Sequence, residues 1–483
     1  MCGCEMGSNH LNEESQFVEK TCISKPVKAT KKLSFLEKVA YGMGGGGEVL
    51  MSNIIFSLAY PIYQAGLGID ARLIGLAVGL PRFWDAISDP LMGNISDNAR
   101  TRWGRRRPFI FIGAIITGLL CMLLWMPPAG LSKTMIFCYF TLISILYFTS
   151  YTVFFVAYNG LGFELTSDYD GRTSVMSFKT FFMNFGGGLF LPLAFRMCFW
   201  FGDNKIEGVR VVGIIFGIAM ICFGILPSIF CKERVHQQQK ISFLDAIKYT
   251  LKNKPFMIVC GIILFAITGL YVAVPLQYYI NMAYVLPGNE SVTSKFMMYG
   301  LYTSCIAGFL SVPIVNLFSR IFGKRRVLQA GMFLVIVGMV SSWLYYTPRN
   351  AYLQLFFGLT VSPGMTCGWV ILPALVADIC DLDELSTGRR REGMFGAIFS
   401  FLMKAGVSLI MIASGYVVSW TCYNASLPTQ SDLTIFRLRF MTAFVPVIFL
   451  GVALVLSFIY PLNKAKILEI QDQLRKKKQE ENL

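Results

Sequence analysis

The sequence predicts an all-α membrane protein with twelve transmembrane helices in two six-helix halves. Of its 483 residues, 55% are hydrophobic and only 15% are charged. The mean hydropathy is +0.57, a surplus that a water-soluble domain does not need. Charged residues are clustered, and the apolar runs between the clusters reach the roughly 20 helical residues that span a bilayer. The basic residues also favour one of the two sides that these runs define.

Twelve apolar runs, separated by polar or helix-breaking residues, are the predicted helices. They cover residues 36–65, 70–97, 107–128, 134–164, 173–200, 208–231, 256–285, 294–319, 327–347, 351–379, 392–421 and 438–462. The longest polar stretch between them divides the chain into two sets of six, and part of it, 243–251, is amphipathic and expected at the membrane surface. The predicted parts are a cytoplasmic tail at 1–34, a six-helix bundle at 35–231, a cytoplasmic loop at 232–255, a second bundle at 256–462 and a cytoplasmic tail at 463–483.

Lysines and arginines favour one side of the predicted membrane. The side of the N-terminus has 31 of the 43, the opposite side has 9, and Arg82, Lys179 and Lys404 fall within predicted helices. Cytoplasmic segments of membrane proteins carry such an excess. We therefore expect a multi-pass protein of the inner cell membrane with both termini in the cytoplasm.

The two halves contain similar turns. GNISDNARTRWGRRRPF follows the second predicted helix and VNLFSRIFGKRRVL follows the eighth, and in each a glycine precedes a basic cluster. Parallel repeats of this kind occur in membrane transporters, which bind their solute between the two halves. The alternative is that any cytoplasmic turn collects arginines.

The second predicted helix carries three charged residues on one face. Arg82, Asp85 and Asp89 stand at i, i+3 and i+7, and would cost several kcal/mol if they faced lipid. Two carboxylates one turn apart repel each other unless a cation lies between them, so the pair is suited to bind Na⁺ or to share a proton. The alternative is that Arg82 neutralises one aspartate and ties the helix to a neighbour, but a single positive charge would leave the other carboxylate without a partner.

Two further charges lie within predicted helices. Lys404 is the only charged residue from Gly393 to Gln430, and a buried ammonium needs a carboxylate or a cavity, which we expect near the second helix between the halves. The alternative is that its side chain extends to the membrane surface. Glu48 follows the glycine run 44–47, which allows close helix approach or local unwinding. It is a candidate proton site or solute acceptor, or else a glutamate near the cytoplasmic opening.

Other classes of protein are disfavoured by the sequence. The net charge of +15 is spread over short segments between apolar runs, so no nucleic-acid partner is expected. The two histidines, His10 and His236, lie in polar segments. The sequence contains neither a GxxxxGK[ST] loop nor a recognisable nucleophile and base. We expect neither an ATP-driven pump nor an enzyme, and no cofactor besides a coupling ion.

The segment RFWDAISDPLMGNISDNARTRWGRRRP resembles the glycoside–pentoside–hexuronide:cation symporters of the major facilitator superfamily. The likeness extends from YGMGGGG at Tyr41 through LVADICDLDEL near Asp378 to MKAG at Lys404. The resemblance implies the major facilitator fold and a secondary transporter that couples Na⁺ or H⁺ to the symport of a small, sugar-like or glycoside-like solute by alternating access. We expect it to work as a monomer in the lipid bilayer.

The resemblance also implies roles for particular residues. The cation-binding residues are Asp85, Asp89, Ser88 and Thr152, the two aspartates being metal ligands if the ion is sodium. Arg82 and Lys404 form the charge network between the halves. The substrate-binding residues are Glu48, Tyr151, Phe155, Asn159 and Trp369.

The solute side departs from the family pattern. Val49 and Phe155 replace two acids that bind galactosides there, and each unpaired sugar hydroxyl would cost about 1–3 kcal/mol. A close galactoside is therefore not expected. A lysolipid or amphipathic-solute transporter, or an uncoupled uniporter, remains the alternative. A receptor or scaffold would need a sizeable soluble domain, which the chain lacks.

Overall fold

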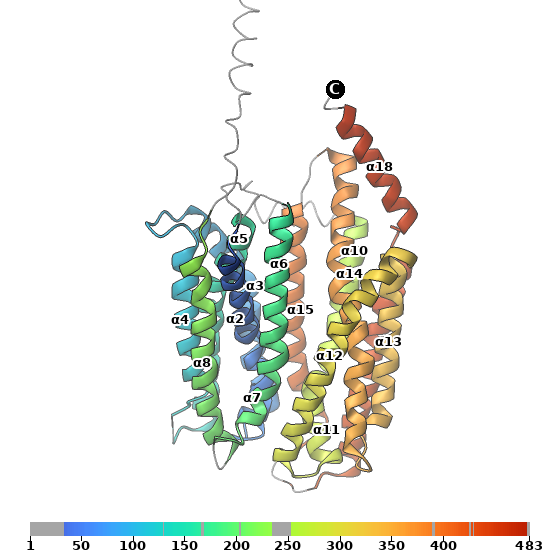
Figure 1. The fold of residues 1–483 in the computed structure, drawn as a ribbon. Helices are drawn as coiled ribbons and strands as arrows, with labels where there is room; N and C mark the ends of the chain where they lie inside the picture. Colours follow the sequence, from blue (N-terminus) through green and yellow to red (C-terminus); the bar gives the residue numbers. More distant parts are fainter. Residues whose placement is uncertain are drawn as a thin grey trace, which may run out of the picture.

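The computed structural model describes residues 33–480, apart from 129, 166–168, 202–203, 234–252, 389–391, 425–426 and 428. The predicted amphipathic helix at 243–251 lies outside the described residues, as does most of the N-terminal tail. In the described part the chain is an all-helical bundle that makes twelve passes in two sets of six, as the sequence predicts (Figure 1).

The first six passes are formed by residues 35–230. They are α2 (Phe35–Ala59) with η1 (Tyr60–Gln64), α3 (Ala71–Asn98), α4 (Arg107–Leu124), α5 (Lys133–Glu164), α6 (Tyr169–Phe185) with η2 (Gly186–Phe190) and α7 (Leu191–Met197), and α8 (Lys205–Phe230). The last six are α10 (Lys254–Val272) with α11 (Val274–Ile280) and η3 (Asn281–Val285), α12 (Glu290–Phe322), α13 (Lys324–Tyr345), η4 (Ala351–Gln354) with α14 (Leu355–Thr387), α15 (Glu392–Trp420), and α16 (Asp432–Ala443) with α17 (Val445–Ile459).

Judged by length and composition alone, nine of the described helical segments are long and apolar enough to cross a membrane. The three passes that do not meet this criterion are α2, α3, and α6 with α7. These three carry Glu48, the Arg82–Asp85–Asp89 stripe and Lys179. Each of the three passes that do not meet the criterion therefore has a charged group in its interior, which points to a polar site among them.

The largest differences from the predicted helices are at the end of α14 and in the C-terminal tail. α14 continues past residue 379 to Thr387 and ends at Gly388, whose φ of 68° is left-handed. The extension is polar in sequence but packed in the fold, since Asp383 and Glu384 are buried. The tail predicted at 463–483 contains α18 (Lys464–Glu480). This helix forms because Ile470 and Leu474 are buried in the core of the C-terminal half.

The two halves meet most closely where α3 packs against α15. Glycines allow this contact: a Cβ atom on Gly75 would lie 2.9 Å from the carbonyl oxygen of Met411. One turn further, Ser408 donates a hydrogen bond to the carbonyl of Gly79 at 2.7 Å. The close packing brings the charged stripe of α3 against the middle of α15.

We call the end of the bundle where α2 begins and α17 ends the terminal end, and the opposite end the far end (Figure 1). Hydrogen bonds and an ion pair join the two halves at the far end. They are Tyr60–Ser414 at 2.9 Å, Tyr279 to Gln64 at 2.9 Å, Arg196 to Ser291 at 2.9 Å, and Lys205 with Glu290. The structure is therefore closed at the far end.

The glycine run of α2 serves close packing, and α2 is helical throughout it. A Cβ atom on Gly44 would lie 2.4 Å from Cγ of Pro227 and 2.6 Å from Cε2 of Tyr158. We expect Gly44→Ala to lower the free energy of unfolding by about 1–3 kcal/mol, the usual cost of overpacking. Thermal unfolding of the detergent-solubilised protein measures it. The matched control is Gly300→Ala, because no other segment of the described chain comes within 4 Å of the new methyl group. Equal stability of the two variants would contradict the packing argument.

Candidate functional site

The charged stripe of α3 lies against Lys404 of α15. The Lys404 Nζ atom is 2.5 Å from Oδ2 of Asp89 and 3.0 Å from Oδ2 of Asp85. Arg82 Nη1 is 3.2 Å from the same Asp85 oxygen. The structure thus brings together the four charged residues that the sequence analysis singled out, and an ammonium from the C-terminal half bridges two carboxylates of the N-terminal half.

Hydroxyl groups complete the environment of Asp85. Thr152, on α5, donates to Asp85 Oδ1 at 2.5 Å. The Ser88 hydroxyl lies 3.2 Å from both Thr152 Oγ1 and the carbonyl oxygen of Asp85. Three of the four residues predicted to bind a cation therefore contact one another, and the fourth, Asp89, is joined to them through Lys404.

The charges of this cluster balance, two negative and two positive. Asp85 is fully buried and Lys404 is 9% exposed, and buried charges are tolerated only when they are paired and hydrogen-bonded. The Arg82 guanidinium also lies among aromatic rings. Its Cζ atom is 5.2 Å from the ring centroid of Phe148 and 5.8 Å from the ring centroid of Phe56. These cation–π contacts hold Arg82 beside Asp85.

The sequence argument that Arg82 alone leaves one carboxylate without a partner needs correction, because Lys404 supplies the second positive charge. The donor set still suits a cation. Asp89 Oδ1 is buried and accepts no hydrogen bond from the residues that the structure describes, and carboxylate and hydroxyl oxygens are the ligands that hard cations prefer. No group of three or more His, Cys, Asp or Glu side chains with metal-binding geometry occurs in the described residues, so a sodium ion here would need the hydroxyls of Ser88 and Thr152. The Lys404 ammonium lies where such a cation would sit.

A second ion pair lies nearer the terminal end. Lys179 Nζ, on α6, is 2.9 Å from Oε2 of Glu48 and donates to Oδ1 of Asn159 at 2.6 Å. It also lies 5.0 Å from the ring centroid of Tyr158. Lys179 was not among the predicted site residues. The sequence did point to it in one way: Lys179 is one of the three basic residues assigned to the membrane spans and not to a segment on either side.

One face of α5 connects the two clusters. Tyr151, Phe155 and Asn159 stand four residues apart, and the rings of the first two stack with centroids 5.4 Å apart. Lys404 Nζ lies 4.4 Å from the Phe155 ring centroid. Asn159 Nδ2 donates to the carbonyl of Phe155 at 3.0 Å. The predicted substrate-binding residues of α5 thus form a continuous strip from the carboxylates to the Glu48 pair.

Trp369 lies in a different setting from the other predicted substrate-binding residues. It is 51% exposed and lines a cavity of about 50 Å³ in the C-terminal half, together with Tyr271 and Met403. Met403 precedes Lys404 on α15, so this cavity adjoins the helix that carries the bridging ammonium.

We expect Lys179→Met to destabilise the protein, because Glu48 would remain buried without its cation. The loss of one partner of a buried ion pair costs about 3–5 kcal/mol. Because the two side chains are 12% and 10% exposed, we expect a loss near the lower end of this range. Thermal unfolding measures it. The control is the reversed pair, Glu48→Lys with Lys179→Glu, which should regain stability. A reversed pair as unstable as Lys179→Met would show that the two charges do not act on each other.

A twelve-pass helical bundle with buried, balanced charges between its halves defines a secondary transporter. The family model described as MFS/sugar transport protein matches residues 40–464, and the chain therefore belongs to this family of the major facilitator superfamily. The resemblance to glycoside–pentoside–hexuronide:cation symporters is confirmed, and the chain is a multi-pass membrane transporter of a small solute, not an enzyme.

Individual relatives agree with this assignment. The chain is 27% identical to "Uncharacterized symporter YnaJ" of Bacillus subtilis, with 90% of this chain and 94% of the relative covered. It is 25% identical to "Putative glycoside/cation symporter YagG" of Escherichia coli, covering 92% and 96%. Among solved structures, a bacterial homologue of the human lysosomal transporter Spinster, in an inward-facing and unoccupied conformation, has a TM-score of 0.67 at 14% identity, covering 90% and 97%. At this identity the structural likeness shows the fold alone.

Proposed function

We propose that the chain is a cation-coupled symporter in which the coupling ion and the Lys404 ammonium occupy the same carboxylate site in alternation. One observation carries this proposal: Lys404 Nζ, from the C-terminal half, lies within 3.0 Å of an oxygen of both Asp85 and Asp89. The ion is Na⁺ or H⁺, since two carboxylates and two hydroxyls suit either.

Charge balance explains why the two cations exclude each other. With Lys404 in place the cluster is neutral, and an added ion would leave a net positive charge in a buried site, which is costly. A coupling ion is therefore favoured only when the ammonium has moved away. Because α3 and α15 belong to different halves, this exchange breaks a contact between the halves. The ion then favours one state of the transport cycle over another, as coupling requires.

The solute is proposed to bind along the α5 strip. Tyr151 and Phe155 supply aromatic rings, which pack well on the apolar face of a sugar, and Asn159 and Glu48 supply polar groups at the end of the strip. Tyr151 is buried in this structure, so the solute would reach it in another state of the transport cycle. A glycoside-like solute fits this arrangement and the name of the Escherichia coli relative, a putative glycoside/cation symporter. A solute bound there would contact Lys404 through Phe155, so solute and ion would influence each other.

A second candidate is a transporter of lysolipid or another amphipathic solute, or an uncoupled uniporter. The observation that favours it is the apolar character of Phe155 and Val49. These two residues replace acids that would accept hydrogen bonds from sugar hydroxyls. In that case Lys404 would remain on the aspartates throughout the cycle.

We further propose that the terminal end faces the cytoplasm of the inner membrane and that the monomer is the working unit. The excess of basic residues on the side of the termini supports the orientation. Labelling of the tail cysteines Cys2 and Cys4 in sealed cells by an impermeant maleimide tests it. Labelling of these two cysteines without permeabilisation would show that the opposite orientation is correct.

A ligand screen by thermal shift tests the proposed function. The purified protein is mixed with glycosides, pentosides, hexuronides and lysophosphatidylcholine, each with and without Na⁺ and at two pH values. A ligand that binds the folded state raises the melting temperature, and we expect a glycoside-like compound to do so more strongly in the presence of one cation. Stabilisation that depends on neither Na⁺ nor pH would favour the uniporter, and stabilisation by the lysolipid alone would favour the second candidate.

A further inference from the structure

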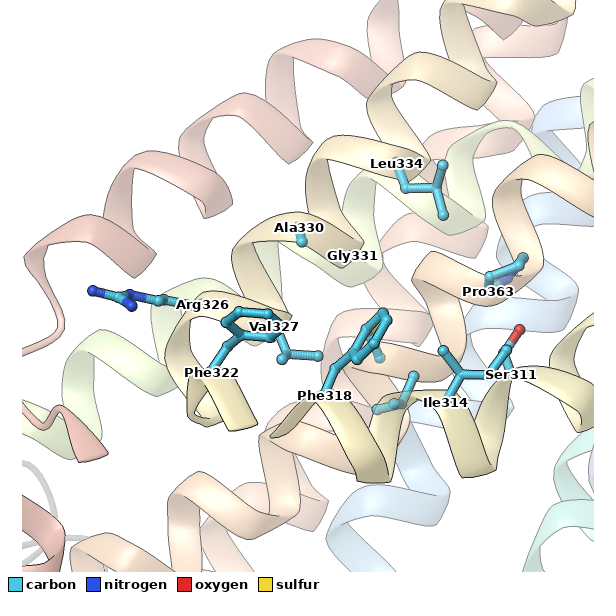
Figure 2. Close-up of a pocket in the computed structure, with 12 residues that line it drawn as sticks. Ser311, Ile314, Phe318, Phe322, Arg326, Val327, Ala330, Gly331, Leu334 and Pro363 are labelled. Atoms are coloured by element: carbon cyan, nitrogen blue, oxygen red, sulfur yellow. The ribbon is translucent and has the colours of Figure 1, made fainter. Parts of the chain in front are cut away.

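A large apolar groove lies on the C-terminal half, away from the charged clusters. It has a volume of about 580 Å³ and lies between α12 and α13 at the terminal end (Figure 2), and Pro363 and Cys367 of α14 also line it. Its walls are apolar side chains of the two helices, among them Phe318, Phe322 and Leu334. A volume of this size lies within the usual range of small-molecule sites.

The groove faces the surroundings of the bundle. Only 11% of the most apolar stretch of α12 is buried, against 33–50% in the other eight apolar spans of the described chain. The other wall, α13, packs against α14, α16 and α17 of its own half. In a bilayer, acyl chains therefore cover this flank. From position 326 to 334 the α13 wall is roughly 12 Å long at 1.5 Å per residue, most of the thickness of one leaflet of hydrocarbon.

A free arginine stands at the end of the groove. Of the three consecutive cations that begin α13, Lys324 pairs with Asp378 at 2.6 Å, and Arg325 donates to the carbonyls of Ser457 and Phe458. Arg326 is exposed and lines the groove. No hydrogen bond or ion pair involves its side chain within the described chain, and in Figure 2 it extends away from the apolar residues. It lies at the terminal end, the level of lipid headgroups.

We propose that this groove binds an anionic phospholipid, with one acyl chain between α12 and α13 and the phosphate paired with Arg326. A guanidinium matches phosphate through two parallel hydrogen bonds. Its neighbours Lys324 and Arg325 are already committed to protein partners, so of these three cations Arg326 is the one available to a phosphate. The site is separate from the transport site and does not rest on the proposed coupling mechanism.

Native mass spectrometry of the delipidated full chain in detergent tests the headgroup. The probes are dioleoylphosphatidylglycerol, which is anionic, and dioleoylphosphatidylcholine, which has the same chains. We expect Arg326→Gln to weaken phosphatidylglycerol binding about fivefold, as one basic group near anionic lipid predicts, and to leave phosphatidylcholine binding unchanged. The matched control is Arg100→Gln, which removes an exposed arginine at the terminal end of the other half and should change neither affinity.

A second variant tests the acyl chain. Ala330 is exposed and lines the groove, so Ala330→Phe should fill it without disturbing the core, with an unchanged melting temperature in lipid-free detergent and weaker binding of both lipids. Unchanged phosphatidylglycerol binding in either variant would overturn the proposal. So would a dimer that Ala330→Phe abolishes while lipid binding persists, because the groove would then be an interface between two copies of the chain.

Discussion

Asp85→Asn is expected to abolish cation-driven uptake of the solute. Asp85 is the fully buried carboxylate that contacts both Arg82 and Lys404 and accepts the Thr152 hydrogen bond. Its neutral replacement leaves the cluster with an excess positive charge, which repels any incoming cation. Coupling between two sites commonly corresponds to a factor of about 5–150, and we expect the ratio of uptake with and without a cation gradient to fall from this range to one.

Uptake into proteoliposomes, with a Na⁺ or a proton gradient imposed in turn, measures this ratio for a solute that stabilises the protein. Asp472→Asn is the matched control, because it makes the same change on the exposed surface of α18. Counterflow of labelled solute without any gradient shows whether the Asp85→Asn protein still binds and moves its solute. Full gradient-driven accumulation by Asp85→Asn would refute the role of Asp85.

Lys404→Met is expected to strengthen cation binding and to uncouple it from transport. Without the ammonium, the cluster has two carboxylates and only Arg82 to balance them, so an external cation restores neutrality. The removal of one partner of a buried ionic group costs about 3–5 kcal/mol, and a bound cation would recover part of this. We expect a lower melting temperature than that of the wild type in choline buffer and a much larger rise on addition of the coupling cation. Gradient-driven accumulation should be lost.

Lys404→Arg is the conservative control for this prediction. It keeps a positive charge between the halves and should retain part of the coupling, although a planar guanidinium does not reproduce the compact ammonium. If Lys404→Met accumulates its solute as the wild type does, then the ammonium does not take part in the ion cycle. If it is destabilised and no cation restores its stability, the site does not admit an external ion.

The membrane passes could be predicted from the sequence because apolar runs bounded by charge are a local signal. The prediction stopped α14 at residue 379, whereas the helix continues to Thr387. The reason is that the apolar run, which is the local signal, ends there, whereas Asp383 and Glu384 of the extension are buried by packing that a local pattern does not contain. α18 was missed for a similar reason, since its stability comes from Ile470 and Leu474 packing on the C-terminal core.

The charged stripe of α3 was also predictable, because helical geometry places i, i+3 and i+7 on one face. Its partners were less so. Lys404 lies 315 residues from Asp89 in sequence, and its place beside the carboxylates was suggested by the cost of burying an ammonium and by the family resemblance, not by any local pattern. The pairing of Lys179 with Glu48 could not be deduced, because the two residues lie on different helices and no spacing relates them. The proposed roles of all these residues in binding remain predictions.

Direct titration of the coupling ion into the solute-free protein tests the central claim most closely. Isothermal calorimetry with NaCl, and proton uptake measured in weakly buffered solution, are applied to the wild type, Asp85→Asn and Lys404→Met. The account predicts that one of the two ions binds the wild type, binds Lys404→Met more tightly and does not bind Asp85→Asn. Equal binding to all three proteins, or none to the wild type and to Lys404→Met, would show that the carboxylates and the ammonium form a fixed structural cluster and not the site of a coupling ion.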